Sequence, residues 1–128
     1  VLKDNNFTTV LVSGGFKPIT TYVQKHLAID YEYSNTFGVV GDLFDGTTNG
    51  PIINANYKEK IVNKLLKKLN LNKNQIIGIG DAANDMNMLL SVGLPIAFKA
   101  QEIVKANFEN QINNTDLTSI LYFLDIKY

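Results

Sequence analysis

The sequence predicts an α/β fold organised around a parallel sheet. Short apolar runs alternate with segments in which apolar residues recur at helical spacing, and the connections between them are short. Two of the apolar runs, residues 75–80 and 94–98, do not alternate with polar residues, as is typical of parallel strands covered on both faces. We therefore expect a single domain over residues 1–128, with right-handed crossovers between its parallel strands.

The chain is expected to begin with a strand, a tight loop and a helix. A β-rich run at residues 7–12 ends at Ser13-Gly14-Gly15, a composition that favours a turn. The next segment has helical spacing at Ile19, Val23 and Leu27, which predicts a helix.

A β-hairpin and a long helix should follow. Residues 30–53 alternate and are broken at Gly41-Asp42 and Asp45-Gly46, which predicts a short strand followed by a small hairpin insertion. Residues 54–71 predict an amphipathic helix with lysines on one face. Its apolar face would consist of Ile61, Leu65, Leu66 and Leu69.

The rest of the chain repeats a strand-and-helix unit. The strand at residues 75–80 leads into a helix that should close at Gly93, and the strand at residues 94–98 leads into another short helix. A last strand at residues 111–114 would precede a helix that Thr115 or Asp116 can cap.

Composition excludes several classes of partner. Twelve lysines balance twelve acidic residues, so the chain has no excess positive charge to hold a nucleic acid backbone. The absence of cysteine excludes disulfides, thiolate metal sites and thiol nucleophiles. Because no apolar run approaches the length of a bilayer span and no leader opens the chain, we expect a soluble, cytoplasmic protein with no membrane partner.

Two strand ends carry polar residues that could do chemistry. In open parallel sheets, ligands bind beyond the carboxyl ends of the strands, so Ser13-Gly14-Gly15 and the loop from Gly80 to Asp85 should share one edge. Asp81 directly follows its strand, where a carboxylate can hold Mg²⁺ together with water and phosphate oxygens. Asn84 and Asp85 stand at the start of a helix, where Asn84 can face a ligand.

Each of these residues also has an ordinary structural explanation. Asp and Asn at a helix N-terminus are common caps, and Ser-Gly-Gly is a common turn as well as a possible anion nest. A lysine such as Lys58 at the start of a lysine-rich helix is usually solvated, and the lone His26 is expected at a surface or boundary position. No single feature decides between these interpretations.

The order of three motifs resembles the phosphoserine phosphatase group of the haloacid dehalogenase-like hydrolases. "VLVSGG", the lysine of "NANYKEKI" and "IGIGDAANDMNM" occur in the order typical of that group, and the resemblance covers residues 7–124. It implies a Rossmann-like sheet, Mg²⁺ as cofactor, and a small phosphorylated metabolite as substrate. For the named group that substrate is phosphoserine, which is converted to serine and phosphate in serine biosynthesis.

The resemblance also implies a role for each candidate residue. Phosphoryl transfer depends mainly on positioning and charge stabilisation, so each role suits the chemistry. Ser13 and the Gly14 N–H would bind a phosphate oxygen, Lys58 would neutralise the phosphoryl group and the nucleophile, Asp81 would ligate Mg²⁺, Asn84 would contact the substrate, and Asp85 would brace the loop and Lys58.

Two departures from the family pattern stand out. Ala82 replaces a usual glycine, and it would strain the loop if that position required a positive φ. The family's Asp-x-Asp strand, which supplies the nucleophile and the general acid and base, has no counterpart in these 128 residues, and Asp4 cannot replace it. The helical cap that recognises serine is missing as well.

These departures predict an incomplete sheet that lacks its central nucleophile strand. We expect the chain to be the C-terminal portion of a longer phosphatase and to be inactive alone. The alternatives are a second segment that completes the sheet, edges paired in a new way, or edges paired with a neighbouring copy. The alternative is a non-catalytic α/β binding module or degenerate remnant. The phosphorylation domain of a cation-pumping ATPase has a similar aspartate loop, but no membrane span and the short stretch from Lys58 to Asp81 disfavour it.

Overall fold

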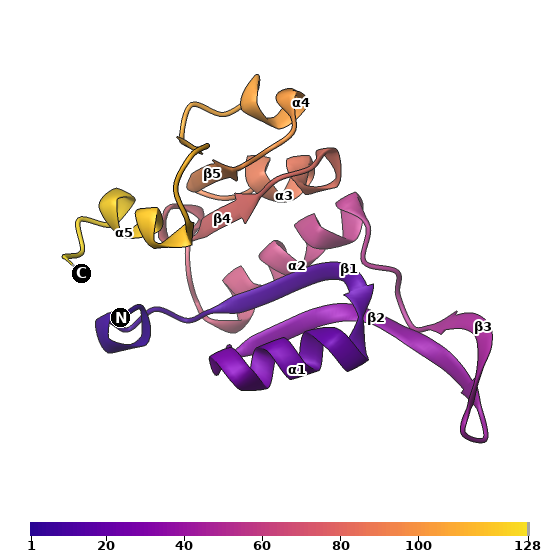
Figure 1. Cartoon of the computed structure of the whole chain (residues 1–128). Helices are drawn as coiled ribbons and strands as arrows, with labels where there is room; N and C mark the ends of the chain where they lie inside the picture. Colours follow the sequence, from indigo (N-terminus) through magenta and orange to yellow (C-terminus); the bar gives the residue numbers. More distant parts are fainter. Residues whose placement is uncertain (128) are drawn as a thin grey trace. The chain divides into compact units, whose positions relative to one another are not determined.

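A computed structural model describes residues 1–127, which fall into two compact units. The first, Val1–Tyr57, is called the N-terminal unit here, and the second, which begins at Lys58, is called the C-terminal unit. Each contains one three-stranded sheet, with the order β1-β2-β3 in the first and β4-β5-β6 in the second (Figure 1). Within residues 1–127, no helix combines the length and the apolar character that crossing a bilayer would require.

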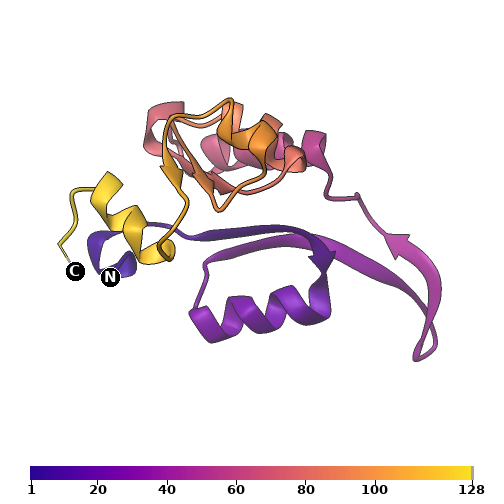
Figure 2. The ribbon, with the colours of Figure 1, turned by 45° about the horizontal axis from the view of Figure 1, so that its top comes forward.

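The N-terminal unit packs one helix against two parallel strands and extends into a hairpin. After a short 3-10 helix at Lys3–Asn5, it comprises β1 (Val10–Phe16), α1 (Lys17–Leu27), β2 (Tyr31–Val40) and β3 (Leu43–Asn49). Strands β1 and β2 are parallel, whereas β2 and β3 are antiparallel. Figure 2 shows α1 lying along β1 and β2, with the hairpin extending beyond the end of the helix.

Strand β1 continues through Ser13-Gly14-Gly15, so the expected tight loop is not present. Neither glycine adopts a positive φ, and the strand runs to Phe16 before α1 begins at Lys17. The strand is nevertheless irregular here, because its pairing with β2 shifts between Val12 and Phe16. The two glycines therefore accompany an interruption in the pairing of β1 with β2, but they do not end the strand.

Helix α1 has the expected position, but the apolar residues whose spacing predicted it are not its buried residues. Ile19 and Leu27 are 71% and 62% exposed, and Val23 is half-buried. The buried residue of this helix is Thr20, which shares a hydrogen bond of 2.8 Å between hydroxyl oxygens with Ser34 of β2. A polar contact therefore holds the buried side of this helix against β2.

The hairpin is built from a longer first strand than expected. Strand β2 has ten residues, and the chain turns only at Gly41-Asp42. Asp45-Gly46 lies within β3, where the positive φ of Gly46 accompanies a shift in the pairing near Val39. This glycine accommodates an irregularity in the strand and not a second turn.

The C-terminal unit begins with α2 and alternates parallel strands with short helices. Helix α2 (Ala55–Lys68) starts just before the boundary and confirms the predicted amphipathic helix, with Ile61 and Leu65 buried. After it come β4 (Ile77–Gly80), α3 (Met86–Leu90), β5 (Leu94–Phe98), α4 (Glu102–Lys105), β6 (Gln111–Ile112) and α5 (Ile120–Phe123), with 3-10 turns at Lys73–Gln75, Ala83–Asp85 and Leu117–Ser119. The three strands are all parallel, as predicted.

The core of this unit lies around β5. Ile96 and Ala97 of β5 are fully buried, together with Leu89 of α3 and Val104 of α4. Helix α3 ends at Leu90, so Gly93 does not close it. A Cβ atom at Gly93 would lie 2.5 Å from the Asn74 Cα, so this glycine is needed for a close backbone approach.

In each sheet, one outer strand carries candidate site residues at its carboxyl end. Among the described residues, β1 pairs with β2 alone and β4 pairs with β5 alone. The second side of β1 and of β4 has no strand partner in the part of the chain that the structure describes, in agreement with the incomplete sheet predicted from the sequence.

Candidate functional site

The best-defined polar feature of the C-terminal unit is a buried ion pair between Lys58 and Asp85. Each residue is 5% exposed, and the Lys58 Nζ lies 2.6 Å from an Asp85 carboxylate oxygen. Lys58 occupies the same face of α2 as Ile61 and Leu65, because positions three and seven residues apart align on a helix. The usual solvated position of a helical lysine therefore does not apply to Lys58.

Asp85 also holds the loop that follows β4. Its second oxygen accepts hydrogen bonds from the Asp81 N–H at 3.0 Å and from the Ala82 N–H at 3.3 Å. Burial would raise the pKa of Asp85, but Lys58 and the loop N–H groups outweigh burial and hold that pKa below its ordinary value. The carboxylate is therefore ionised when it braces the loop and Lys58.

Gly80 allows this close contact. A Cβ atom at Gly80 would lie 2.6 Å from the Asp85 Cβ and 2.9 Å from its carboxylate. The strand can approach the buried carboxylate only because residue 80 has no side chain.

Gln101 closes the loop from the other side. Its backbone N–H donates to the Asp81 carbonyl at 2.8 Å, and its side-chain oxygen accepts the Ala83 N–H at 3.2 Å. Asp85 and Gln101 together satisfy the N–H groups of residues 81–83. The side chains of Asp81 and Asn84 are exposed, and neither caps a backbone N–H within residues 1–127.

Ala82 does not strain the loop. Its φ of −125° and ψ of 165° lie in the extended region that any L-residue adopts. The strain expected if this position required a positive φ is therefore absent, and the alanine is compatible with the observed position of Asp81.

In the N-terminal unit, Ser13 and Gly14 form a second polar cluster. Ser13 is half-buried, and its Oγ accepts the Gly15 N–H at 2.9 Å. The Gly14 carbonyl accepts a hydrogen bond of 2.9 Å from the buried side chain of Asn35, which also accepts the Ile53 N–H at 2.8 Å. This cluster is called the serine segment below, and residues 80–85 are called the aspartate loop.

Comparison with known proteins assigns the chain to a family. The sequence profile of the haloacid dehalogenase-like hydrolases matches residues 3–124, which is most of the chain. The chain belongs to this family. Its fold agrees with a solved substrate-bound phosphoserine phosphatase complex, with a TM-score of 0.88 and 32% identity over 98% of this chain and 59% of that one.

Curated relatives share a large part of the sequence but are longer. A probable phosphoserine phosphatase of Schizosaccharomyces pombe is 38% identical over 98% of this chain and 43% of the relative. A phosphoserine phosphatase of Lactococcus lactis is 35% identical over 90% of this chain and 53% of the relative. The chain thus spans about half the length of these curated relatives.

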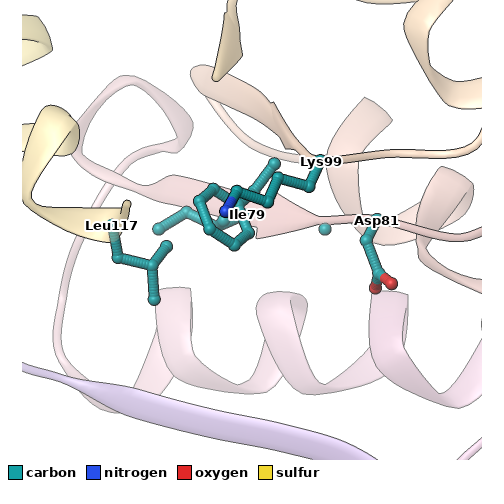
Figure 3. Close-up of a pocket in the computed structure, with 6 residues that line it drawn as sticks. Ile79, Asp81, Lys99 and Leu117 are labelled. Carbon is teal, nitrogen blue, oxygen red and sulfur yellow. The ribbon is translucent and has the colours of Figure 1, made fainter. Parts of the chain in front are cut away.

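A cavity of about 300 Å³ lies beside the aspartate loop of this haloacid dehalogenase-like chain. It is lined by the ends of β4 and β5 and by the 3-10 turn before α5, through Ile79, Gly80, Asp81, Phe98, Lys99 and Leu117. Figure 3 shows the Lys99 side chain extending toward Ile79, and its ammonium lies 5.6 Å from the centre of the Phe98 ring. Asp81, directly after the end of β4, also lines the cavity.

The donor chemistry of Asp81 fits a magnesium site in part. Mg²⁺ is commonly held in proteins by one or two carboxylates, with water and phosphate oxygens completing its octahedron. Asp81 offers one such carboxylate, which is exposed and caps no backbone N–H among the described residues. Residues 1–127 contain no group of three or more acidic or histidine side chains placed to surround a metal.

The six residues chosen from the sequence fall into two groups. Lys58, Asp81 and Asp85 are linked through the aspartate loop, and Asn84 lies exposed in the same loop. Ser13 and Gly14 belong to the other unit, and their convergence with the first group stays a prediction.

Two residues that shape these clusters were missed from the sequence. Asn35 lies within a strand, and asparagine is depleted in strands, so its presence in "YSNTF" was an available signal. Gln101 lies between β5 and α4, at the edge of the sheet where the sequence predicts the other polar loops, and that position was the available signal.

Proposed function

We propose that the chain supplies the phosphate- and metal-binding portion of a Mg²⁺-dependent phosphomonoester hydrolase that converts phosphoserine to serine and phosphate. The observation that carries the proposal is the buried Lys58–Asp85 pair, which is tied through the Asp81 N–H to the aspartate loop of a haloacid dehalogenase-like chain. Relatives that are phosphoserine phosphatases support the choice of substrate.

In the proposed reaction each candidate residue would have one role. Lys58, oriented by Asp85, would place a positive charge against the phosphoryl group, and Asn84 would donate from an exposed amide to the substrate. Ser13 and the Gly14 N–H would donate to a phosphate oxygen. Asp81 would hold Mg²⁺, which when bound supplies charge neutralisation for the phosphate.

The nucleophile would come from outside these 128 residues. An aspartate carboxylate would bond to phosphorus as the serine oxygen leaves, and a second aspartic acid would protonate that oxygen. Water would then cleave the aspartyl phosphate and release inorganic phosphate. The partner that completes the site would be an N-terminal segment or a second chain carrying such a strand.

Measurement of phosphate release from phosphoserine tests the proposal. The 128-residue chain with Mg²⁺ should give no sustained release, whereas the protein with an Asp-x-Asp strand, in the same reading frame or added as a second chain, should turn over. In that active form, Asp81→Asn should abolish most activity, and Asp42→Asn, at the exposed hairpin turn, should not. Sustained turnover by the chain alone would refute the need for an added nucleophile.

Failure of the completed protein to hydrolyse any phosphomonoester would favour the alternative, a non-catalytic binding module. Retained binding of inorganic phosphate or Mg²⁺ by that protein would then identify it as a remnant that keeps part of the site.

A further inference from the structure

The peptide unit that joins Gly14 to Gly15 is held on both sides by side chains. Its carbonyl oxygen accepts a hydrogen bond of 2.9 Å from the Asn35 side-chain amide. Its N–H donates to the Ser13 Oγ at 2.9 Å. Because the peptide is planar, a rotation of this one unit would break both hydrogen bonds together.

This peptide needs an external restraint. It lies between two glycines, which lack the Cβ atom that limits rotation of the backbone elsewhere. Both glycines are exposed, and pairing between β1 and β2 is irregular over this part of the strand. The regular ladder therefore does not fix the orientation of the Gly14–Gly15 peptide.

Asn35 is placed to supply the restraint. It is 7% exposed, and its side-chain oxygen accepts the Ile53 N–H at 2.8 Å while its amide nitrogen faces the Gly14 carbonyl. A backbone carbonyl only accepts and a backbone N–H only donates, so these two partners fix which way the amide points. Asn35 lies on β2, and its side chain therefore links the serine segment of β1 to Ile53, in the segment that follows the hairpin.

The restraint on the Gly14–Gly15 peptide also fixes the side chain of Ser13. Because its Oγ accepts the Gly15 N–H, the side chain is held in one rotamer, and its own O–H remains able to donate. We propose that Asn35 is a positioning residue that orients the Ser13 hydroxyl toward a bound phosphate, acting through the Gly14–Gly15 peptide. This inference rests on the proposed function of Ser13.

Asn35→Asp tests the contact with Gly14 selectively. An aspartate keeps an oxygen for the Ile53 N–H, but it replaces the donor to the Gly14 carbonyl with a second acceptor. Asn35→Ala removes both contacts and serves as a second variant if the aspartate prevents folding. Asn49→Asp makes the same chemical change at an exposed position of β3 and is the matched control.

The kinetic test is a double-mutant cycle in the active protein. Asn35→Asp should lower kcat/KM for phosphoserine about tenfold and weaken inhibition by inorganic phosphate, as expected for loss of one hydrogen bond to phosphate. Ser13→Ala should cost as much or more. The Ser13→Ala, Asn35→Asp double variant should be no worse than Ser13→Ala alone, because Asn35 acts through Ser13.

A general structural role for Asn35 would give a different result. The two losses would then multiply in the double variant, and that outcome would overturn the inference. An Asn35→Asp protein that matches Asn49→Asp in kcat/KM and in phosphate inhibition would overturn it as well.

Amide hydrogen exchange of Gly15 separates this inference from the proposed function. The Gly15 N–H should exchange about tenfold faster in Asn35→Asp or Asn35→Ala than in the unmodified chain and the Asn49→Asp control, because its peptide is no longer held. Unchanged exchange would refute the positioning role even in an active phosphatase. Absence of phosphatase activity alongside faster exchange would instead refute the proposed function of Ser13.

Discussion

The serine segment and the aspartate loop solve the same problem with different chemistry. The serine segment lies in β1 and the aspartate loop begins at the end of β4, and in both a side chain holds backbone groups. In the serine segment the holding group is the neutral amide of Asn35. In the aspartate loop it is the Asp85 carboxylate, whose charge is balanced by Lys58.

The difference sets how strongly each region depends on its holding residue. If the Asn35 amide is removed, water can still hydrate the Gly14 carbonyl that it held, because Gly14 is exposed. A buried charge that loses its partner stays in a region that water does not reach. The aspartate loop should therefore respond more strongly to single substitutions than the serine segment.

The largest effect is expected from Lys58→Ala. It leaves the buried Asp85 carboxylate without its ion-pair partner, which we expect to destabilise the protein by about 3–5 kcal/mol. Chemical denaturation measures the change. Lys105→Ala, which breaks the exposed pair with Glu102, is the control and should cost about 0–1 kcal/mol. Equal losses in the two variants would show that the Lys58 pair is effectively solvated.

A matched glycine substitution should separate the two regions further. In Gly80→Ala the new Cβ would meet the Asp85 Cβ at 2.6 Å, and Asp85 is held on both of its oxygens, so we expect a loss of about 1–3 kcal/mol. In Gly14→Ala the nearest atom is the Ile53 carbonyl oxygen at 3.7 Å, an ordinary contact, so stability should change little. Denaturation midpoints of the two variants give the comparison, and a reversed order would contradict it.

The sequence predicts the helices and strands better than it predicts the contacts within the serine segment and the aspartate loop. The spacing in α2 and the unbroken apolar run of β5 report burial directly, so these elements were found near their observed positions. The Ser-Gly-Gly run predicts a turn because glycine favours turns, but in the structure it stays in a strand. Thr20 was not recognised as buried because the Ser34 hydroxyl that bonds it lies on another element.

The same limit applies to the candidate residues. Asp81 and Asp85 could be chosen because both lie in the short connection between β4 and α3, residues 81–85. The burial of Lys58 follows from its position on the face of Ile61 and Leu65, but its charge favoured the solvated interpretation. Asn35 and Gln101 bind backbone groups 18 to 21 residues away, a pairing that no local pattern encodes.

The smallest effect is expected from Gln101→Ala. The backbone bond from residue 101 to the Asp81 carbonyl remains, and the side chain is exposed, so water can replace its bond to the Ala83 N–H. Stability should fall by less than about 1 kcal/mol. In the active protein, Gln101→Ala should nevertheless raise the Mg²⁺ concentration that gives the half-maximal rate, because the aspartate loop is then held on one side only. Gln111→Ala, whose amide donates elsewhere, to the Lys105 and Phe108 carbonyls, is the control. An unchanged Mg²⁺ requirement in Gln101→Ala would mean that Asp85 alone is sufficient to position Asp81.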